Sequence, residues 1–289
     1  MLSDISLFKS LLSVKKLNNK KYFDTNLKRW NELVKINSNS KTYDLKEFKE
    51  GKSSLLQIEL EELDDVNGKA LLHLQCHFGM DTLSWARLGA RVVGIDFSDK
   101  AIELAHDLSN ELNIPSEFIH SNIYDIPKRI TKENFDIVFT SYGVLCWLSD
   151  LYKWAEIINY CLKPGGVFYI IDGHPFGSLI DENYKEDFKI GYNYFTQGKP
   201  IRFDDDKTYA DTNISVQNKV TYEWFHTISE IVNSLLNVKL QVDFLHEFPF
   251  GFFQIHPDMK QREDGYWEFQ TLKYSIPMMF SLKAHKLKI

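Results

Sequence analysis

A single carboxylate, Asp96, directly follows the β-branched segment at residues 91–95. Upstream, the apolar run Ala70–Leu74 is long enough for a buried strand and too short for a helix. Residues 81–88 lie between them and space their apolar side chains as a short helix does. Parallel strands joined by a helical crossover leave a crevice at their carboxyl ends, where a carboxylate can accept hydrogen bonds from both hydroxyls of a ribose. The pattern predicts a site for an adenosine-containing cofactor across Gly79 and Asp96.

The turn before the helix shows which cofactor classes are disfavoured. It reads Gln75-Cys76-His77-Phe78-Gly79 and contains one glycine. A dinucleotide site uses G-x-G-x-x-G, because its pyrophosphate lies on bare backbone at a helix N-terminus. A pyrophosphate would meet the side chains of Gln75 and His77, so an NAD-dependent oxidoreductase is disfavoured. A cofactor without phosphates tolerates this turn.

At these residues the chain resembles the class I S-adenosylmethionine-dependent methyltransferases, whose first motif has the same order of strand, turn, helix, strand and acid. The resemblance is strong from about Ser54 to Lys163 and looser elsewhere. It departs from the usual glycine-rich turn at Gln75 and His77. It implies S-adenosylmethionine as methyl donor, S-adenosylhomocysteine as product, and no metal. It also implies a set of cofactor-binding residues: Gln75, His77, Gly79, Asp96, Phe97, Asn122, Ile123 and Ser141.

Some of these assignments compete with purely structural interpretations. Asp96 could cap the next helix, but Ser98 is better placed for that role. Gly79 could be simple turn punctuation, although its position at the strand–helix junction favours close approach of the cofactor's methionine end. Asn122 follows the third expected strand, where a polar residue of the family contacts the adenine amino group and the next backbone N–H reaches a ring nitrogen. The alternative for Asn122 is an Asx turn that ends the strand.

The catalytic candidates follow the fourth and fifth expected strands. In the family, the end of the fourth strand brings cofactor and acceptor together, and Tyr142 could offer its ring to the sulfonium and its hydroxyl to the acceptor. His174 could deprotonate an acceptor hydroxyl, thiol or amine, or could equally be a structural hydrogen-bonding residue. The sequence Thr140-Ser141-Tyr142-Gly143 lacks the Asn/Asp-Pro-Pro-aromatic tetrad with which some relatives clamp a flipped base. Trp147 is expected in the core.

Strands and helices alternate through the middle of the chain, which predicts a parallel, doubly wound α/β sheet. The resemblance implies seven mostly parallel strands with an antiparallel edge strand. Expected strands cover residues 70–74, 91–95, 117–121, 135–141, 167–171, 240–248 and 277–286, and expected helices include 24–34 capped by Asp24, 55–63, 151–162 and one opening at Thr227.

Residues 1–53 are expected to form an N-terminal helical cap and residues 54–289 the methyltransferase domain. Residues 176–222 follow the fifth strand and are too long for an ordinary connection, so they are expected to be a lid or a binding insertion. With no other segment available to cover the carboxyl edge of the sheet, the cap and the insertion should form a roof over the acceptor. Their aromatic side chains are candidate substrate contacts: Trp30, Tyr43, Tyr194 and Phe195.

Composition narrows the class of partner. A net charge of −6 argues against a nucleic-acid surface, and the basic run at residues 15–21 is short. The three cysteines lack zinc spacing, and the acidic run at residues 204–206 is expected to be a solvated turn. No apolar run approaches the roughly 18 residues that a membrane span requires. A cytoplasmic protein without nucleic-acid or membrane partners is expected, and its oligomeric state stays open.

Together these features favour a methyltransferase that acts on a small-molecule acceptor by direct displacement. The motifs define the donor and leave the acceptor atom open among oxygen, nitrogen, sulfur and carbon. The alternative is a catalytically silent S-adenosylmethionine-binding regulatory module on the same fold.

Overall fold

The computed structural model describes residues 19–181, 189–211 and 213–288. Its centre is a seven-stranded sheet in the order β3-β2-β1-β4-β5-β11-β8. Strand β11 pairs antiparallel with both β5 and β8, and the β1–β2, β2–β3, β1–β4 and β4–β5 pairs are parallel. The predicted sheet is confirmed, with the antiparallel strand lying one place inside the edge. The strands are β1 (Ala70–Leu74), β2 (Arg91–Asp96), β3 (Glu117–His120), β4 (Phe135–Ser141), β5 (Leu162–Gly173), β8 (Leu240–Phe248) and β11 (Met279–Lys286).

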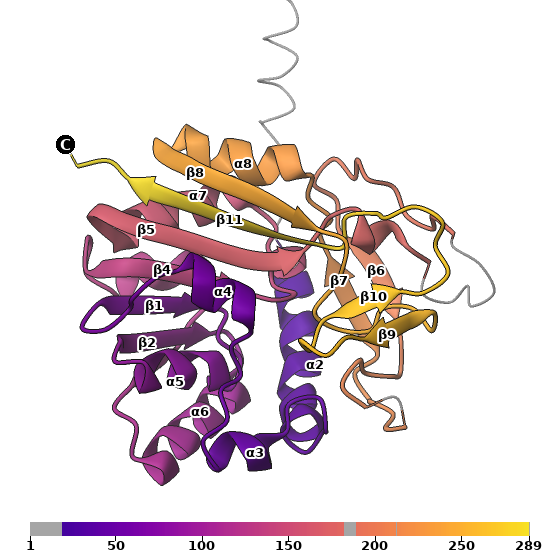
Figure 1. The fold of residues 1–289 in the computed structure, drawn as a ribbon, viewed down its shortest axis with the longest axis horizontal. Helices are drawn as coiled ribbons and strands as arrows, with labels where there is room; N and C mark the ends of the chain where they lie inside the picture. Colours follow the sequence, from indigo (N-terminus) through magenta and orange to yellow (C-terminus); the bar gives the residue numbers. More distant parts are fainter. Residues whose placement is uncertain (1–18, 182–188, 212, 289) are drawn as a thin grey trace, which may run out of the picture.

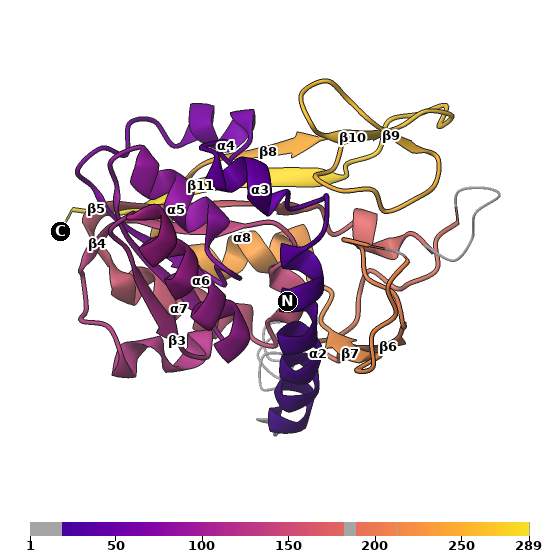
Figure 2. The ribbon, with the colours of Figure 1, turned by 90° about the horizontal axis from the view of Figure 1, so that it is seen from below.

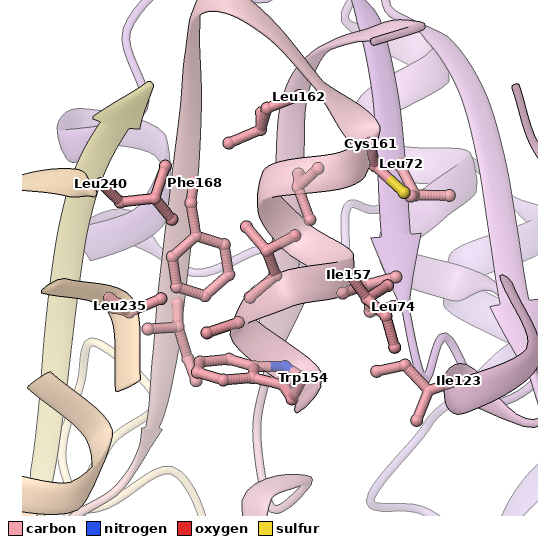
Figure 3. Packing of buried hydrophobic residues seen from close by; sticks show 14 of the residues in the cluster. Leu72, Leu74, Ile123, Trp154, Ile157, Cys161, Leu162, Phe168, Leu235 and Leu240 are labelled. Carbon is pink, nitrogen blue, oxygen red and sulfur yellow. The ribbon is translucent and has the colours of Figure 1, made fainter. Parts of the chain in front are cut away.

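Helices cover both faces of this sheet (Figure 2). Apolar side chains of α7 and α8 pack on one face in a cluster with Trp154 and Phe168 at its centre (Figure 3). Side chains of α4 and α5, including Trp85, pack on the other face with Leu71 and Phe139. These two layers fix the strand tips that carry the predicted site. The helices are α4 (Gln57–Glu62), α5 (Met80–Arg87), α6 (Asp99–Leu112), α7 (Leu151–Cys161) and α8 (Ile228–Asn237).

Local capping signals predicted several helix starts. The Ser98 hydroxyl accepts the Ala101 N–H at 3.0 Å and so caps α6. Thr227 and Glu230 form the capping box that opens α8. The first described helix, α2 (Lys20–Ser38), differs from the prediction, because Asp24 lies inside it and pairs with Lys20 at 2.5 Å rather than capping it. The buried residues of α2 include the polar Asn26, Arg29 and Asn37 beside Leu33 and Val34, so the apolar spacing located the helix but neither its ends nor most of its buried face.

Strand β5 is longer than predicted. It begins at Leu162 instead of at residue 167, so Pro164, Gly165 and Gly166 lie within it. Gly165 keeps a left-handed φ of 81°, and the pairing with β4 shifts register between Phe135 and Ile137. A bulge therefore absorbs the turn residues.

The insertion after β5 contains a two-stranded antiparallel sheet, β6 (Ile201–Asp204) and β7 (Val220–Glu223). Helix α2 stands between this small sheet and the tips of the main strands (Figure 1). The Asn26 amide and the Tyr222 backbone exchange two hydrogen bonds of 2.8 Å. Arg29 donates to the carbonyls of Asp205 and Lys207 at 2.6 Å each. The cap and the insertion thus form one continuous wall beside the strand tips.

A further segment also reaches this end of the molecule, which the sequence did not predict. Residues 249–278 connect β8 to β11 and contain β9 (Met259–Gln261) and β10 (Trp267–Phe269), which pair antiparallel. The Phe252 ring lies 4.7 Å from the ring of Tyr142, and Phe253 lies 5.6 Å from Tyr209. The expectation that nothing else could cover the carboxyl edge is therefore wrong. Mixed aromatic and polar residues without a clear period concealed this hairpin.

The stretch at residues 1–18, which includes most of the basic run, lies outside the described residues. Within the described ranges, no helix combines the length and the apolar character needed to cross a bilayer.

Candidate functional site

A pocket lies at the carboxyl ends of β1 and β2, where the sequence places the cofactor. Its empty space amounts to about 440 Å³, part of it open to solvent. The wall combines residues of the strand tips, of α2 and of the loop after β4: Phe23, Asn26, Gln75, Ile95, Asp96, Phe97, Ser121, Asn122, Ile123, Tyr124, Trp147 and Leu148. Of the predicted cofactor residues, Gln75, Asp96, Phe97, Asn122 and Ile123 line it.

Asp96 is the acidic group of this pocket and is 7% exposed. Its Oδ2 accepts the His77 N–H at 2.8 Å, and its Oδ1 accepts the Ser98 N–H at 2.8 Å. Burial raises the pKa of Asp96 to about 6, against the opposing effect of these backbone donors. The two donors fix the orientation of the carboxylate and leave further lone pairs on both oxygens. A ribose diol fits such an acceptor.

The turn before α5 holds three residues in the left-handed region. Gln75 has a φ of 58°, His77 of 51° and Gly79 of 83°. A Cβ at Gly79 would stand 2.6 Å from ring atoms of Phe118, so both conformation and packing require glycine there. The close approach at Gly79 is made by Phe118, and Gly79 does not line the pocket. Gln75 and His77 adopt a backbone that glycine adopts at lower cost.

Two buried polar side-chain atoms of this turn lack hydrogen-bond partners in the described part of the chain, which bears on whether the pocket suits the cofactor. Gln75 Oε1 and His77 Nε2 are buried and have no hydrogen-bond partner among the described residues. Burial lowers the pKa of His77 to about 3, so its imidazole is neutral. Buried polar atoms without partners are uncommon in folded proteins. Gln75 lines the pocket and His77 does not, so a ligand with a polar group at its methionine end would supply a partner for Gln75 Oε1, and in this respect the pocket fits S-adenosylmethionine.

The adenine side of the pocket combines the two interpretations of Asn122. Its Oδ1 accepts the Tyr124 N–H at 3.0 Å and caps the 3₁₀ helix Ile123–Lys128, as an Asx turn does. Its side chain also lines the pocket together with Ile123. The cap holds the Asn122 oxygen in place, and the amide nitrogen is a donor that could serve an acceptor nitrogen of the adenine ring.

Sequence reasoning missed several wall residues. Trp147, which was expected in the core, lines the pocket, and its ring meets that of Trp30 edge-on at 5.4 Å. Trp147 ends the short 3₁₀ helix Leu145–Trp147, and its indole N–H donates to the Gly143 carbonyl at 2.8 Å. Phe23 and Asn26 reach the pocket from α2. Their apolar and amide types carry no sequence signal for this role.

The loop after β4 is held by a buried carboxylate at the end of β5. Asp172 accepts the backbone N–H groups of Gly143, Val144 and Leu145, the last two at 3.2 and 3.1 Å. Burial raises the pKa of Asp172, while these donors oppose the rise. Asp172, at the end of β5, therefore holds the loop that carries Trp147 in place.

The candidates at the tip of β4 do not line the pocket but contact buried acids. The Ser141 hydroxyl donates to Asp81 at 2.9 Å and lies 3.2 Å from His73 Nε2. Tyr142 has a φ of 42° and donates its hydroxyl to Glu59 Oε2 at 2.7 Å. Burial raises the pKa of Glu59 to about 8 and also raises that of Asp81. Glu59 and Asp81 were missed because each lies on a helix expected to be merely structural.

Both ring nitrogens of His174 have close neighbours. Nδ1 accepts the Phe176 N–H at 3.0 Å, and Nε2 lies 2.8 Å from Glu247 Oε1. Burial lowers the pKa of His174, against the pull of Glu247. These contacts favour the structural role that the sequence left open.

The predicted substrate contacts fall into two groups. Trp30 and Tyr43 place their rings 5.4 Å from the His77 ring, so both meet the cofactor turn. The Tyr43 and Tyr209 hydroxyls lie 2.6 Å apart, which joins the cap to the insertion. Tyr194 instead accepts the Ile228 N–H at 3.1 Å at the start of α8, and Phe195 is 68% exposed. The structure does not bring this second pair to the turn.

In the described part of the chain, no three His, Cys, Asp or Glu side chains are grouped so as to hold a metal ion. In the acidic run, the Asp205 carbonyl accepts from Arg29, and the Asp206 carboxylate lies 3.2 Å from Lys219.

Comparison with known proteins finds methyltransferases similar to part of this chain. A model described as a methyltransferase domain matches residues 72–170. An uncharacterised methyltransferase of Synechocystis is 32% identical over 126 residues, which are 43% of this chain and 56% of that protein. A ubiquinone biosynthesis O-methyltransferase of Proteus mirabilis is 30% identical over 133 residues, which are 45% of this chain and 49% of that protein. The chain spans about half the length of these curated relatives.

Solved structures show the same fold at low sequence identity. A methyltransferase of Methanosarcina mazei superposes with a TM-score of 0.54 and 17% identity, covering 81% of this chain and 98% of the other. One of Mesorhizobium loti gives a TM-score of 0.53 and 16% identity, covering 78% and 94%. Both are described as S-adenosylmethionine-dependent. The family model, the sheet order and the motif ending at Asp96 agree on a methyltransferase domain over residues 72–170, and the solved structures show that the chain has the fold of these enzymes.

Proposed function

We propose that this chain binds S-adenosylmethionine in the pocket at the tips of β1 and β2 and transfers its methyl group to a small-molecule acceptor. The observation that carries this proposal is the buried carboxylate of Asp96, oriented by two backbone donors in the wall of that pocket. The cofactor, when bound, supplies a methyl group on a sulfonium, which needs alignment with the acceptor and exclusion of water.

The residues divide the work of binding. Asp96 accepts the ribose hydroxyls, and Asn122 and Ile123 face the adenine. Phe23 and Asn26 of α2 close the pocket from the side opposite the sheet. Trp147 and Leu148, on the loop anchored by Asp172, exclude water from the same space.

The acceptor side is proposed to lie where the aromatic residues of three segments meet. Trp30 and Tyr43 come from the cap, Tyr209 from the insertion, and Phe252 from the connection between β8 and β11. Such a lining suits a small, partly apolar acceptor more than a polyanion. The net charge of −6 agrees with this, as does the name of the Proteus relative.

Tyr142 is proposed to orient the acceptor, with its hydroxyl held by Glu59. His174 is retained as a candidate base, in which role it would first have to release the Phe176 N–H from Nδ1 or Glu247 from Nε2. Proton removal is needed only for an acceptor that must lose a proton to react, and a positioned base contributes roughly 10²–10⁴-fold in such cases.

Calorimetry and an acceptor screen together test this function. S-adenosylhomocysteine should bind and NAD should not. A panel of phenols, thiols, amines and carbon acids, with a ribosomal RNA fragment as a separate arm, should then release S-adenosylhomocysteine with a small molecule only. Turnover with the RNA alone would refute the small-molecule acceptor, and binding without turnover on any arm would favour a silent binding module.

A further inference from the structure

The side chain of Gln75 occupies a turn position whose backbone favours glycine. Its φ is 58°, and its side chain lines the cofactor pocket. A non-glycine residue in the left-handed region costs stability, and such outliers are frequent where a side chain serves a ligand. The identity of the side chain at this position therefore calls for a use within the pocket.

The orientation of the Gln75 amide is fixed by the loop after β4. Its Nε2 donates to the Val144 carbonyl at 3.0 Å. That carbonyl cannot turn away freely, because the Leu145 N–H of the same peptide group donates to Asp172 Oδ2 at 3.1 Å. A flipped amide would place its oxygen against the Val144 carbonyl oxygen, so the nitrogen faces Val144 and Oε1 faces elsewhere.

The oxygen end of this fixed amide lacks a partner among the described residues. Oε1 is buried and accepts no hydrogen bond from any described residue. A buried acceptor without a donor destabilises the protein, and a ligand that brings a donor relieves that cost. Oε1 has no proton, so it would repel a carboxylate and attract a donor.

The donors of the proposed cofactor are the ribose hydroxyls, the adenine amino group and the α-ammonium group. Asp96 and the region of Asn122 account for the first two. We propose that Gln75 Oε1 accepts a hydrogen bond from the α-ammonium group of the cofactor and so selects adenosine thioethers that carry an amine. This inference rests on the proposed function, because it assigns one residue of the same site to one group of the ligand.

The test compares three ligands by calorimetry on the full chain and its Gln75→Met variant. Methionine keeps the length of the side chain and removes the amide. The probes are S-adenosylhomocysteine, S-adenosyl-3-thiopropylamine, which keeps the amine and lacks the carboxylate, and 5′-methylthioadenosine, which lacks both. Gln75→Met should lower the affinity for S-adenosylhomocysteine and for S-adenosyl-3-thiopropylamine by about tenfold or more, because a charge-assisted hydrogen bond is lost. It should leave the affinity for 5′-methylthioadenosine within about twofold of the parent value.

Lys239→Gly is the matched control for backbone effects. Lys239 also has a left-handed φ of 63°, but it is exposed at the end of α8. This variant should bind all three probes as the parent does. If Gln75→Met does not fold, Gln75→Gly gives the same comparison, because it relieves the left-handed backbone.

Three results would overturn the inference. These are an unchanged affinity for S-adenosylhomocysteine, an equal loss for all three probes, and a loss for S-adenosylhomocysteine that the amine analogue does not share. A parent protein that binds none of the probes refutes the proposed function as well, which separates the two failures.

Discussion

The hydroxyl of Tyr142 donates a hydrogen bond of 2.7 Å to Oε2 of Glu59, a side chain with no solvent exposure. The other carboxylate oxygen of Glu59 accepts the Leu56 N–H at 2.7 Å. Through this pair, the helix that precedes the first strand supports the residue at the tip of β4. The buried carboxyl also makes the stability of the fold depend on pH.

Glu59→Gln should flatten the dependence of unfolding free energy on pH. Burial raises the pKa of Glu59 from 4.5 to about 8. A raised folded-state pKa means that its contribution is fully present below pH 4.5 and is lost as the pH rises through 8. Relative to the parent, the variant should gain stability across this window, on the order of 4 kcal/mol at its upper end. Urea denaturation of parent and variant at pH 4, 6 and 8.5 measures the difference in unfolding free energy. A difference that stays the same at all three pH values would contradict the raised pKa of Glu59.

Tyr142→Phe should destabilise the protein by about 1–3 kcal/mol, because it removes a hydrogen-bond donor from a buried carboxyl. Combined with Glu59→Gln, its effect should be clearly less than additive, since the two residues contact each other. Its affinity for S-adenosylhomocysteine should stay within about twofold, because Tyr142 does not line the cofactor pocket. Additive denaturation energies would show that the pair is not coupled.

Asp96→Ala should lower the affinity for S-adenosylhomocysteine by about ten- to a hundredfold, because a charged acceptor is lost. In the parent, affinity should also fall as the pH drops below about 6, where the carboxyl takes up a proton. Calorimetry at pH 5 and pH 7.5 checks both statements. Asp107→Asn, at an exposed position on α6, should change neither the affinity nor its dependence on pH. Equal affinity of Asp96→Ala and parent would remove Asp96 from the site.

Gly79→Ala should destabilise the fold by about 2–4 kcal/mol, from the left-handed backbone and from contact of the new Cβ with Phe118. Gly68→Ala is the matched comparison, because Gly68 has a φ of 72° and nothing within 4 Å of the added atom. Thermal melts should therefore show a smaller loss at Gly68. Similar losses at both positions would mean that the ring of Phe118 moves aside without cost.

Binding of S-adenosylhomocysteine should slow hydrogen exchange in residues 24–50 and 189–200. Helix α2 supplies two residues of the pocket wall and is bound to the insertion through Arg29. Ordering of one should therefore reach the other. Exchange mass spectrometry with and without the ligand gives the comparison, with residues 228–237 of α8 as the internal reference. Unchanged exchange in both segments would argue against a roof that closes.

The parts that sequence predicted well depend on local chemistry. The tip position of Asp96, the cap at Ser98 and the capping box at Thr227 each need only a few neighbouring residues. The strand pattern around Phe135 likewise needs only its own apolar run.

The parts that it missed depend on contacts between distant segments. Trp147 lines the pocket because Trp30 and α2 stand opposite it. Glu59 meets Tyr142 across 83 residues. The connection between β8 and β11 brings Phe252 to Tyr142 at the tip of β4 and contains the hairpin β9–β10, although its sequence has no strand-like period. No window of neighbouring residues contains such information.

The two-way hydrogen bonding between Asn26 and Tyr222 spans 196 residues, and Arg29 reaches partners almost as far away. Helix α2 leaves the ribosome long before the strand that receives it. During synthesis its polar contacts with Tyr222 stay unmade until β7 has emerged. Contacts so remote in sequence close late because of the entropy of the intervening loop. The pocket wall nearest the N-terminus is thus among the last to be completed as the chain folds.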